Sequence, residues 1–308
     1  MGVKSRIGSA ILKSVKNSDW YANYLFQDCE KFWNMSEFNL DVVNLGSTSA
    51  VHAFDYSGLP IKGANWALSR NYLAGDRAVL QNYVSHLRPK GATVLIPLCL
   101  FSSLSGRYEY FDDRYYTILY PSSIPDFSKS RQIQVMDLKN NPVPHYPAFR
   151  LWLSFRKKLK GMFHRDKPRI LSEIDMERNA SMWIKDWMRE FSLDDLSSPL
   201  SLVSKDAVDV AVKILDEIIA YCRDLGHNPV LVFPPMYHTL AEKFLKDARD
   251  LLVGSMVGSL KYKDVAYMNY MDDAEFFCAP ELFENACLMN GAGAKRFTSR
   301  VLKDIGLI

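Results

Sequence analysis

Short apolar runs alternate along this chain with longer segments of helical periodicity, and this alternation restricts the fold more than any other feature. The apolar runs have the length and the β-branched content of buried strands: 42–45, 93–98 and 229–233. The other segments repeat apolar residues every three or four positions: about 76–87, 205–225, 237–252 and 293–303. Strands that alternate with helices predict a parallel sheet with helices on both faces, so we expect an α/β fold.

The functional site is expected beyond the carboxyl ends of the predicted strands, because parallel α/β sheets bind their ligands there. The segments that follow the three strands are 46–49, 98–103 and 233–238. The carboxyl ends of parallel strands meet at one edge of a sheet, so all three segments are predicted to lie on one rim.

The alternating pattern breaks down between about residues 106 and 204. This stretch begins with an aromatic and charged run and continues through several prolines to segments that carry Trp152, Trp183 and Trp187. We interpret it as an insertion beside the rim, either a lid or a packed subdomain, with its aromatic residues in a core rather than forming sugar-stacking platforms. We therefore expect the chain to fold into one flavodoxin-like, three-layer αβα domain over 1–308 with a mostly parallel sheet.

The composition is that of an ordinary globular protein and excludes several classes of partner. Hydrophobic residues make up 48% of the chain, and the formal net charge is only +3. Recognition of nucleic acid would require a concentrated basic face, so no nucleic-acid partner is expected. No window approaches the roughly 18 apolar residues of a membrane-spanning helix, so no transmembrane segment is expected.

The N-terminal segment is basic and has helical periodicity. Val3, Ile7, Ile11 and Val15 recur at helical spacing with lysines between them, and no signal-peptide core is visible. We expect this helix to dock onto the domain in a cytoplasmic protein. The alternative is peripheral contact with a membrane surface through the same apolar stripe.

Neither a metal nor a cofactor is predicted. The five cysteines are odd in number and form no C-x-x-C pair, which indicates neither a disulfide framework nor a zinc ribbon. An acidic cluster near the C-terminus lacks metal-ligand spacing and is expected to orient a basic group instead. Its members are Asp272, Asp273, Glu275, Glu281 and Glu284.

Three short segments follow one another along the chain: residues 44–50 (NLGSTSA), 63–67 (GANWA) and 285–298 (NACLMNGAGAKRFT). Together they resemble the SGNH/GDSL hydrolase superfamily, and most closely its branch linked to O-acylation of bacterial surface polysaccharides. The first segment lies where that family has its strand–Gly-Asp-Ser–helix turn, and the second is similar to the block whose glycine lends an oxyanion amide. The third is similar to the C-terminal signature Asp-x-x-His-Leu-Asn-x-x-Gly-Ala-x-x-Phe-Thr.

The resemblance implies nucleophilic acyl transfer by a hydroxyl at the first turn. The nucleophile position, two residues after Gly46, holds Thr48 instead of serine, and Ser47 and Ser49 flank it. The threonine methyl group restricts χ1 and crowds the approach to a carbonyl. The alternative for these hydroxyls is capping of the following helix or contact with an anion.

Several other residues are predicted to bind the substrate. By the resemblance, Gly46 and Ser49 contribute to the substrate site, and Gly63 takes the place of the oxyanion glycine, although a plain turn explains Gly63 equally well. Asn65 is expected to offer an amide. The asparagine that the family has after the next strand finds no match here, and Ser102 offers a hydroxyl in that segment.

The usual catalytic pair is absent from the C-terminal block. The alignment places Asn285 at the carboxylate position and Leu288 at the histidine position. Leucine cannot accept a proton, and a general base is worth about 10²–10⁴-fold in rate. His238 is the best-placed substitute, after the third predicted strand, and His52 follows Ser49 by one helical turn.

Two functions follow from these observations. The first is an SGNH-like esterase or O-acyltransferase that acts on an acylated bacterial carbohydrate through a degraded Ser-Asp-His site. The alternative is a pseudoenzyme: a catalytically inactive SGNH-fold protein that binds a carbohydrate or an acylated small molecule in polysaccharide biosynthesis.

Overall fold

The computed structural model describes residues 3–107, 111–147 and 170–308, and the chain divides into two compact units. One unit contains residues 1–35 and 111–169, and the other contains residues 36–110 and 170–308. The expected insertion at about 106–204 therefore contributes to both units, and the prediction of one domain with an inserted lid stays a prediction.

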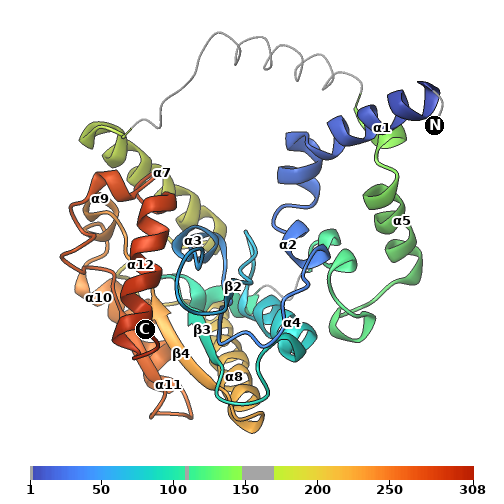
Figure 1. Ribbon diagram of the computed structural model, residues 1–308. Helices are drawn as coiled ribbons and strands as arrows, with labels where there is room; N and C mark the ends of the chain where they lie inside the picture. The colour runs from blue at the N-terminus through green and yellow to red at the C-terminus, as the bar shows by residue number, and fades with distance from the viewer. Residues whose placement is uncertain (1–2, 108–110, 148–169) are drawn as a thin grey trace. The chain divides into compact units, whose positions relative to one another are not determined.

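The larger unit contains the predicted parallel sheet. Five strands pair in the order β2-β1-β3-β4-β5, and every neighbouring pair is parallel (Figure 1). The strands are β1 (Val42–Asn44), β2 (Gly63–Asn65), β3 (Thr93–Pro97), β4 (Asn228–Phe233) and β5 (Ala266–Asn269). This order is the flavodoxin-like one, so the predicted α/β class is confirmed. β1 and β3 are fully buried, as their apolar runs predicted.

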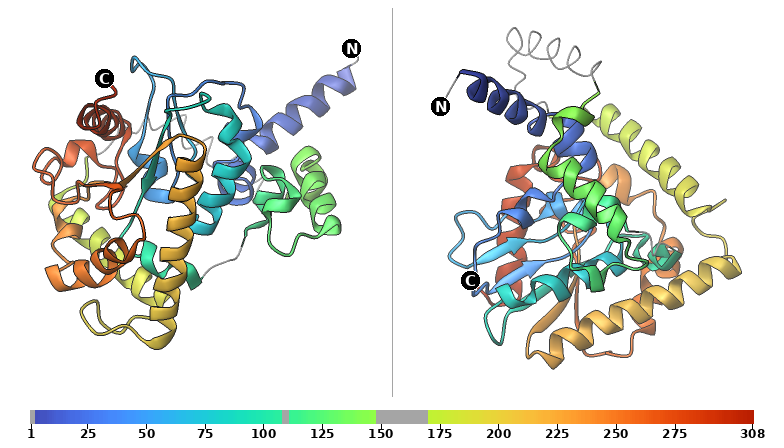
Figure 2. Two further views of the ribbon diagram at one scale, coloured as in Figure 1. Left: turned by 90° about the horizontal axis from the view of Figure 1, so that it is seen from below. Right: turned by 90° about the vertical axis from the view of Figure 1, so that its right-hand side faces the viewer.

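Helices cover both faces of this sheet. On one face, α3 (Thr48–Ala53) packs against α12 (Gly291–Asp304). On the other, α8 (Leu202–Asp224) packs against α4 (Leu73–Tyr83) and α11 (Ser255–Ser259), as Figure 2 shows. α8 buries an apolar stripe in phase with its turns, including Ala211, Leu215 and Cys222. Two 3-10 turns, Val84–His86 and Pro280–Leu282, complete the connections.

The prediction of a single helix over 237–252 is wrong. It is divided into α9 (His238–Ala241), α10 (Lys246–Arg249) and a π-helical turn at Asp250–Gly254. The break has a physical reason, because the Arg249 guanidinium donates to the carbonyl oxygens of Ala241 and Phe244 where the first helix ends. These bonds satisfy carbonyl groups that lack helical partners.

Helix α7 (Glu173–Phe191) contacts the segments that follow β3 and β4 at their carboxyl ends. Its Phe191 ring stacks on Phe101 at 4.9 Å between centroids, and Trp187 lies 5.1 Å from the same ring. Trp187 also lies 6.3 Å from Phe244, but its side chain is only half-buried, so the core position expected for the aromatic residues of the insertion stays a prediction. The 3-10 turn Ser102–Arg107 packs against α8.

The smaller unit is helical in its described part. It contains α1 (Val3–Lys16), a π turn (Trp20–Leu25), α2 (Glu30–Trp33), α5 (Lys129–Asn140) and 3-10 turns at Asp113–Thr117, Pro121–Ser123 and Val143–His145. α1 packs on the turns at 20–25 and 143–145, with Val15 buried and Ile11 45% exposed. Because Val15 is buried while Ile11 is exposed, the choice between docking of the N-terminal helix and contact with a membrane surface stays a prediction. Trp152 lies outside the described residues.

No helix in the described part of the chain is both long and apolar enough to span a membrane.

Candidate functional site

The rim turn, which we define as Gly46-Ser47-Thr48-Ser49, connects buried β1 to α3. Gly46 has φ of +115°, a conformation that L side chains rarely adopt. An added Cβ there would also lie 2.6 Å from the Ala50 Cβ. Both the backbone conformation and the lack of room for a side chain therefore require glycine at this position. The strand end and the sharp turn that the sequence predicted are therefore present.

The hydroxyl groups of Ser47 and Thr48 bind a neighbouring loop. Ser47 Oγ accepts the backbone N–H of Asn71 at 3.2 Å, and Thr48 Oγ1 accepts that of Arg70 at 3.0 Å. Ser47 occupies the N-cap position of α3, but its side chain makes no capping hydrogen bond. The capping expectation is wrong for Ser47, because its hydroxyl group is bonded to loop 68–72 instead. Ser47, Thr48 and Ser49 are all half-buried.

A buried carboxyl group lies behind the rim turn. Asp76 Oδ1 accepts the Gly46 N–H at 2.8 Å and an Asn71 side-chain N–H at 2.6 Å. Burial raises the pKa of Asp76 to about 7, although both hydrogen bonds lower it. A group with this pKa changes its charge near neutral pH, which is typical of functional sites.

Gly63 and Asn65 lie in β2, beside β1. The amide of Asn65 is bonded within the fold: its Nδ2 faces the carbonyl oxygens of Ala50, Val51 and Phe54 at 2.9–3.1 Å. Its Oδ1 accepts from the side chain of Asn44 and from the backbone of Ala67. Asn65 therefore ties the end of α3 to the sheet.

The tyrosine ring of Tyr56 explains the glycine at position 63. A Cβ on Gly63 would overlap that ring, which lies directly against the strand. Gly63 and Asn65 also line an open hollow of about 690 Å³ together with Phe38, Phe54 and Tyr56. The two predicted substrate-binding residues thus lie beside a cavity, on the α3 side of β2.

Ser102 lies after β3, on the predicted rim, and is buried. Its Oγ accepts the Cys99 N–H at 2.9 Å and lies 3.4 Å from the Cys99 sulfur. This pattern closes a tight turn at the strand end. Burial raises the pKa of the Cys99 thiol, so the neutral thiol is favoured over the thiolate that nucleophilic attack requires.

Asn285 and Leu288 lie in one loop before α12. Asn285 Oδ1 accepts the backbone N–H groups of Cys287 and Leu288, both at 3.0 Å. Leu288 is buried, with 8% of its surface exposed. The asparagine thus shapes its own loop, and the leucine packs in the core.

The remainder of the C-terminal block starts a helix. Asn290 Oδ1 accepts the N–H groups of Ala292 and Gly293 at 3.0 Å, which caps α12. Gly293 lies so close to Leu282 that an added Cβ would overlap its carbonyl oxygen. The start of α12 therefore explains the presence of both Asn290 and Gly293, independently of any catalytic role.

His238 is held between two glutamates. Its Nε2 lies 2.9 Å from Glu173 Oε1, and its Nδ1 lies 3.7 Å from Glu242 Oε2. The other oxygen of Glu173 accepts the Tyr237 O–H at 2.8 Å. Burial and that hydrogen bond raise the pKa of Tyr237 well above its usual value. His238, predicted as the base, thus joins α9 to the start of α7.

His52 forms a second imidazole–carboxylate pair. Its Nδ1 lies 3.6 Å from Glu284 Oε2, with 32% of the histidine side chain exposed. The pair brings α3, which begins in the rim turn, next to the loop that contains Asn285 and Leu288. A carboxylate beside one nitrogen of an imidazole is the arrangement that orients a general base.

The other histidines that the structure describes are bonded to groups outside the rim turn or are buried. His86 Nδ1 lies 2.8 Å from the Glu37 carbonyl oxygen, and His145 pairs with Asp137 at 3.1 Å in the smaller unit. His227 is buried, and burial lowers its pKa. His164 lies outside the described residues.

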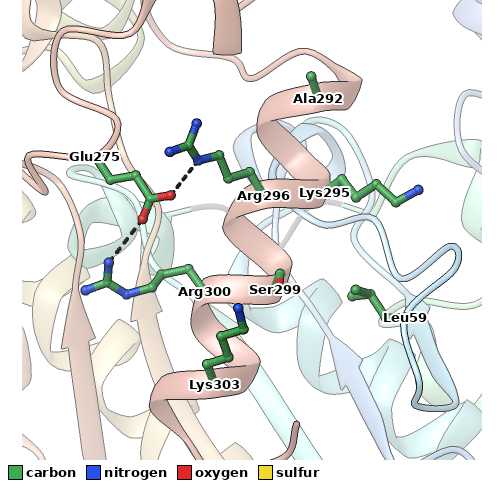
Figure 3. A pocket seen from close by; sticks show the side chains of 8 residues that line it. All are labelled: Leu59, Glu275, Ala292, Lys295, Arg296, Ser299, Arg300 and Lys303. Atoms are coloured by element: carbon green, nitrogen blue, oxygen red, sulfur yellow. Dashed lines mark hydrogen bonds and ion pairs between the residues drawn. The ribbon is translucent and has the colours of Figure 1, made fainter.

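The acidic cluster orients basic groups, as predicted for it. Glu275 binds both Arg296 and Arg300 of α12, and these side chains line an open hollow of about 620 Å³ (Figure 3). Asp272 pairs with Arg249. No group of three or more potential metal ligands is found over 3–107, 111–147 and 170–308.

Sequence reasoning assigned no role to Asp76, which contacts the rim turn, or to Glu173, which contacts the predicted base. The helix expected to begin at Asp76 begins at Leu73, so Asp76 lies within its first turns and faces inward. Its spacing of four from the buried Leu80 was the available signal. Glu173 gave no such signal, because its pairing with His238 joins distant parts of the chain.

Comparisons of this chain with models of protein families, with curated proteins and with solved structures found no match.

Proposed function

We propose that this chain binds an acylated carbohydrate at the rim turn and lacks the hydrolytic triad of the SGNH/GDSL hydrolases that it resembles. The observation that carries the proposal is the bonding of the rim-turn hydroxyls. Ser47 and Thr48 are held by backbone amides of loop 68–72, while His52 and His238 are each paired with a glutamate. The ligand class follows from the resemblance.

The bonded hydroxyls suit ligand recognition. A hydroxyl group that accepts one N–H retains its own hydrogen and a second lone pair. Ser47 and Thr48 therefore offer two preorganised groups at the end of a buried strand, where α/β proteins bind ligands. The carbonyl oxygen of an acyl ester and the hydroxyl groups of a sugar are suitable partners for them.

Binding is expected to depend on both the acyl group and these hydroxyls. Calorimetric titration with 6-O-acetyl-glucose should show binding that unmodified glucose does not match. Ser47→Ala and Thr48→Ala should each weaken it by about fivefold, because a net hydrogen bond is worth about 1 kcal/mol. The exposed Ser259→Ala in α11 is the control and should bind as the parent does. Equal affinity for both sugars, or unchanged affinity in both variants, would contradict the proposal.

The His52–Glu284 pair favours a second function, ester hydrolysis or O-acyl transfer with a displaced base. Ser49 precedes His52 by three positions on the same helix, so both side chains share one face. In this reaction Ser49 Oγ attacks the ester carbonyl and the His52 imidazole takes its proton. The proton then passes to the leaving alcohol as the C–O bond breaks, and water or an acceptor hydroxyl releases the acyl group.

Hydrolysis of p-nitrophenyl acetate tests this second function. His52→Ala should lower kcat/KM by about 10²–10⁴-fold, the usual contribution of a general base. Glu284→Gln should lower it less, since the imidazole remains. His145→Ala is a matched control, because His145 is also paired with a carboxylate but in the other unit. Parent-level rates in His52→Ala would exclude the displaced base.

A further inference from the structure

The buried carboxyl group of Asp76 is not used in either proposed function. Asp76 lies in α4 with 3% of its surface exposed. Unpaired buried carboxylates are costly, so a buried acid normally has a compensating set of donors. Its donors here are the Gly46 N–H of the rim turn and the side chain of Asn71.

Asn71 connects this carboxyl group to the rim-turn hydroxyls. Its side chain donates to Asp76 at 2.6 Å, while its backbone N–H donates to Ser47 Oγ at 3.2 Å. The neighbouring Leu68 N–H also donates to the Gly46 carbonyl oxygen at 3.0 Å. Asp76 therefore contacts the rim turn directly through Gly46 and indirectly through Asn71.

We propose that Asp76 is a positioning residue, whose carboxyl group holds Gly46 and Asn71 and thereby sets the orientation of the Ser47 hydroxyl. The geometry of the contacts carries this inference by itself. Its consequence for ligand affinity rests on the proposed binding function.

The charge of Asp76 controls the strength of this contact. Hydrogen bonds to a carboxylate are roughly twice as strong as those to a neutral acceptor. Because burial raises the pKa of Asp76 to about 7, the carboxylate and the neutral acid are both populated near neutral pH. The nearby Arg77 is paired with Glu217 of α8, and Arg70 is exposed. Ionisation of Asp76 is therefore expected to tighten the Gly46 and Asn71 contacts.

The amide of Gly46 reports this ionisation directly. Leucine precedes glycine at two positions in the chain, Leu45-Gly46 and Leu225-Gly226. Labelling leucine with carbonyl ¹³C and glycine with ¹⁵N therefore selects two amide signals by NMR. Leu225→Met removes the second signal and so assigns the first. Gly226 donates to the Arg223 carbonyl oxygen at the end of α8 and serves as an internal control.

We expect the Gly46 signal to shift with pH along a single titration curve with a midpoint near 7, while the Gly226 signal does not follow that curve. Asp76→Asn keeps an acceptor oxygen but has no titrating proton, so its Gly46 signal should lose this transition. Asn71→Ala removes a hydrogen bond that lowers the pKa of Asp76, so its midpoint should move upward. The parent titration needs no variant, so misfolding of a variant leaves the test intact.

The same samples separate this proposal from the binding function. In the parent protein, affinity for 6-O-acetyl-glucose should be about fivefold higher at pH 8 than at pH 6, a difference of about 1 kcal/mol. This pH dependence should vanish in Asp76→Asn. A Gly46 signal without a transition, or with the same transition in Asp76→Asn, overturns the positioning role. A normal Gly46 transition without any binding overturns the proposed function alone.

Discussion

Gly293→Ala is expected to lower the free energy of unfolding by about 3 kcal/mol, the upper part of the range for overpacking a closely fitted site. The added Cβ would overlap the backbone carbonyl oxygen of Leu282, which cannot rotate away as a flexible side chain can. Urea unfolding at constant pH measures the change.

Gly291→Ala is the matched control for this substitution. Gly291 lies two residues earlier in α12, and nothing lies within 4 Å of an added Cβ there. Alanine is favoured over glycine in helices by up to about 1 kcal/mol, so this variant should be as stable as the parent or slightly more stable. Equal losses in the two variants would contradict the close approach of α12 to Leu282.

Asp76→Asn is expected to change how stability depends on pH. Burial raises the pKa of Asp76 from 3.8 to about 7, so the folded protein holds this proton more tightly than the unfolded chain does. The stabilisation that comes from the proton is complete below about pH 4 and is lost as the pH rises through 7. The shift of about three units corresponds to at most about 4 kcal/mol.

The unfolding free energy of Asp76→Asn relative to the parent should therefore rise by about 2–4 kcal/mol between pH 4 and pH 8. Urea unfolding at several pH values measures this difference. Asp206→Asn makes the same chemical change at an exposed position of α8 and should leave the parent's pH dependence unaltered. Parallel curves for the parent and Asp76→Asn would show that the carboxyl group does not titrate in this range.

The strands that could be predicted from the sequence are the ones with bulky apolar residues. β1, β3 and β4 coincide with the apolar runs because all three are interior strands with a neighbouring strand on each side. β2 and β5 are the edge strands, and neither has a continuous apolar run. Gly63-Ala64-Asn65 is too short to show a periodicity, although it pairs with β1 in parallel and its glycine lies against the Tyr56 ring.

The candidate site was predictable in its location but not in its contacts. The end of an apolar run at Gly46 locates the rim turn from local sequence alone. The bonds from Asp76 to Gly46 and from His52 to Glu284 depend on how helices are placed on the sheet. No local pattern specifies that placement, because each pair is joined through tertiary packing.

The parallel strand order also determines when the sheet can be completed. β3 and β4 pair directly, yet residues 98–227 lie between them in the chain. Synthesis therefore produces β1, β2 and β3 long before β4 is available. During that time, one edge of the apolar β3 lacks its native partner. Such an edge is a template for pairing with other chains. We therefore expect the yield of folded protein to depend on how well that edge is protected until residue 233 has been synthesised.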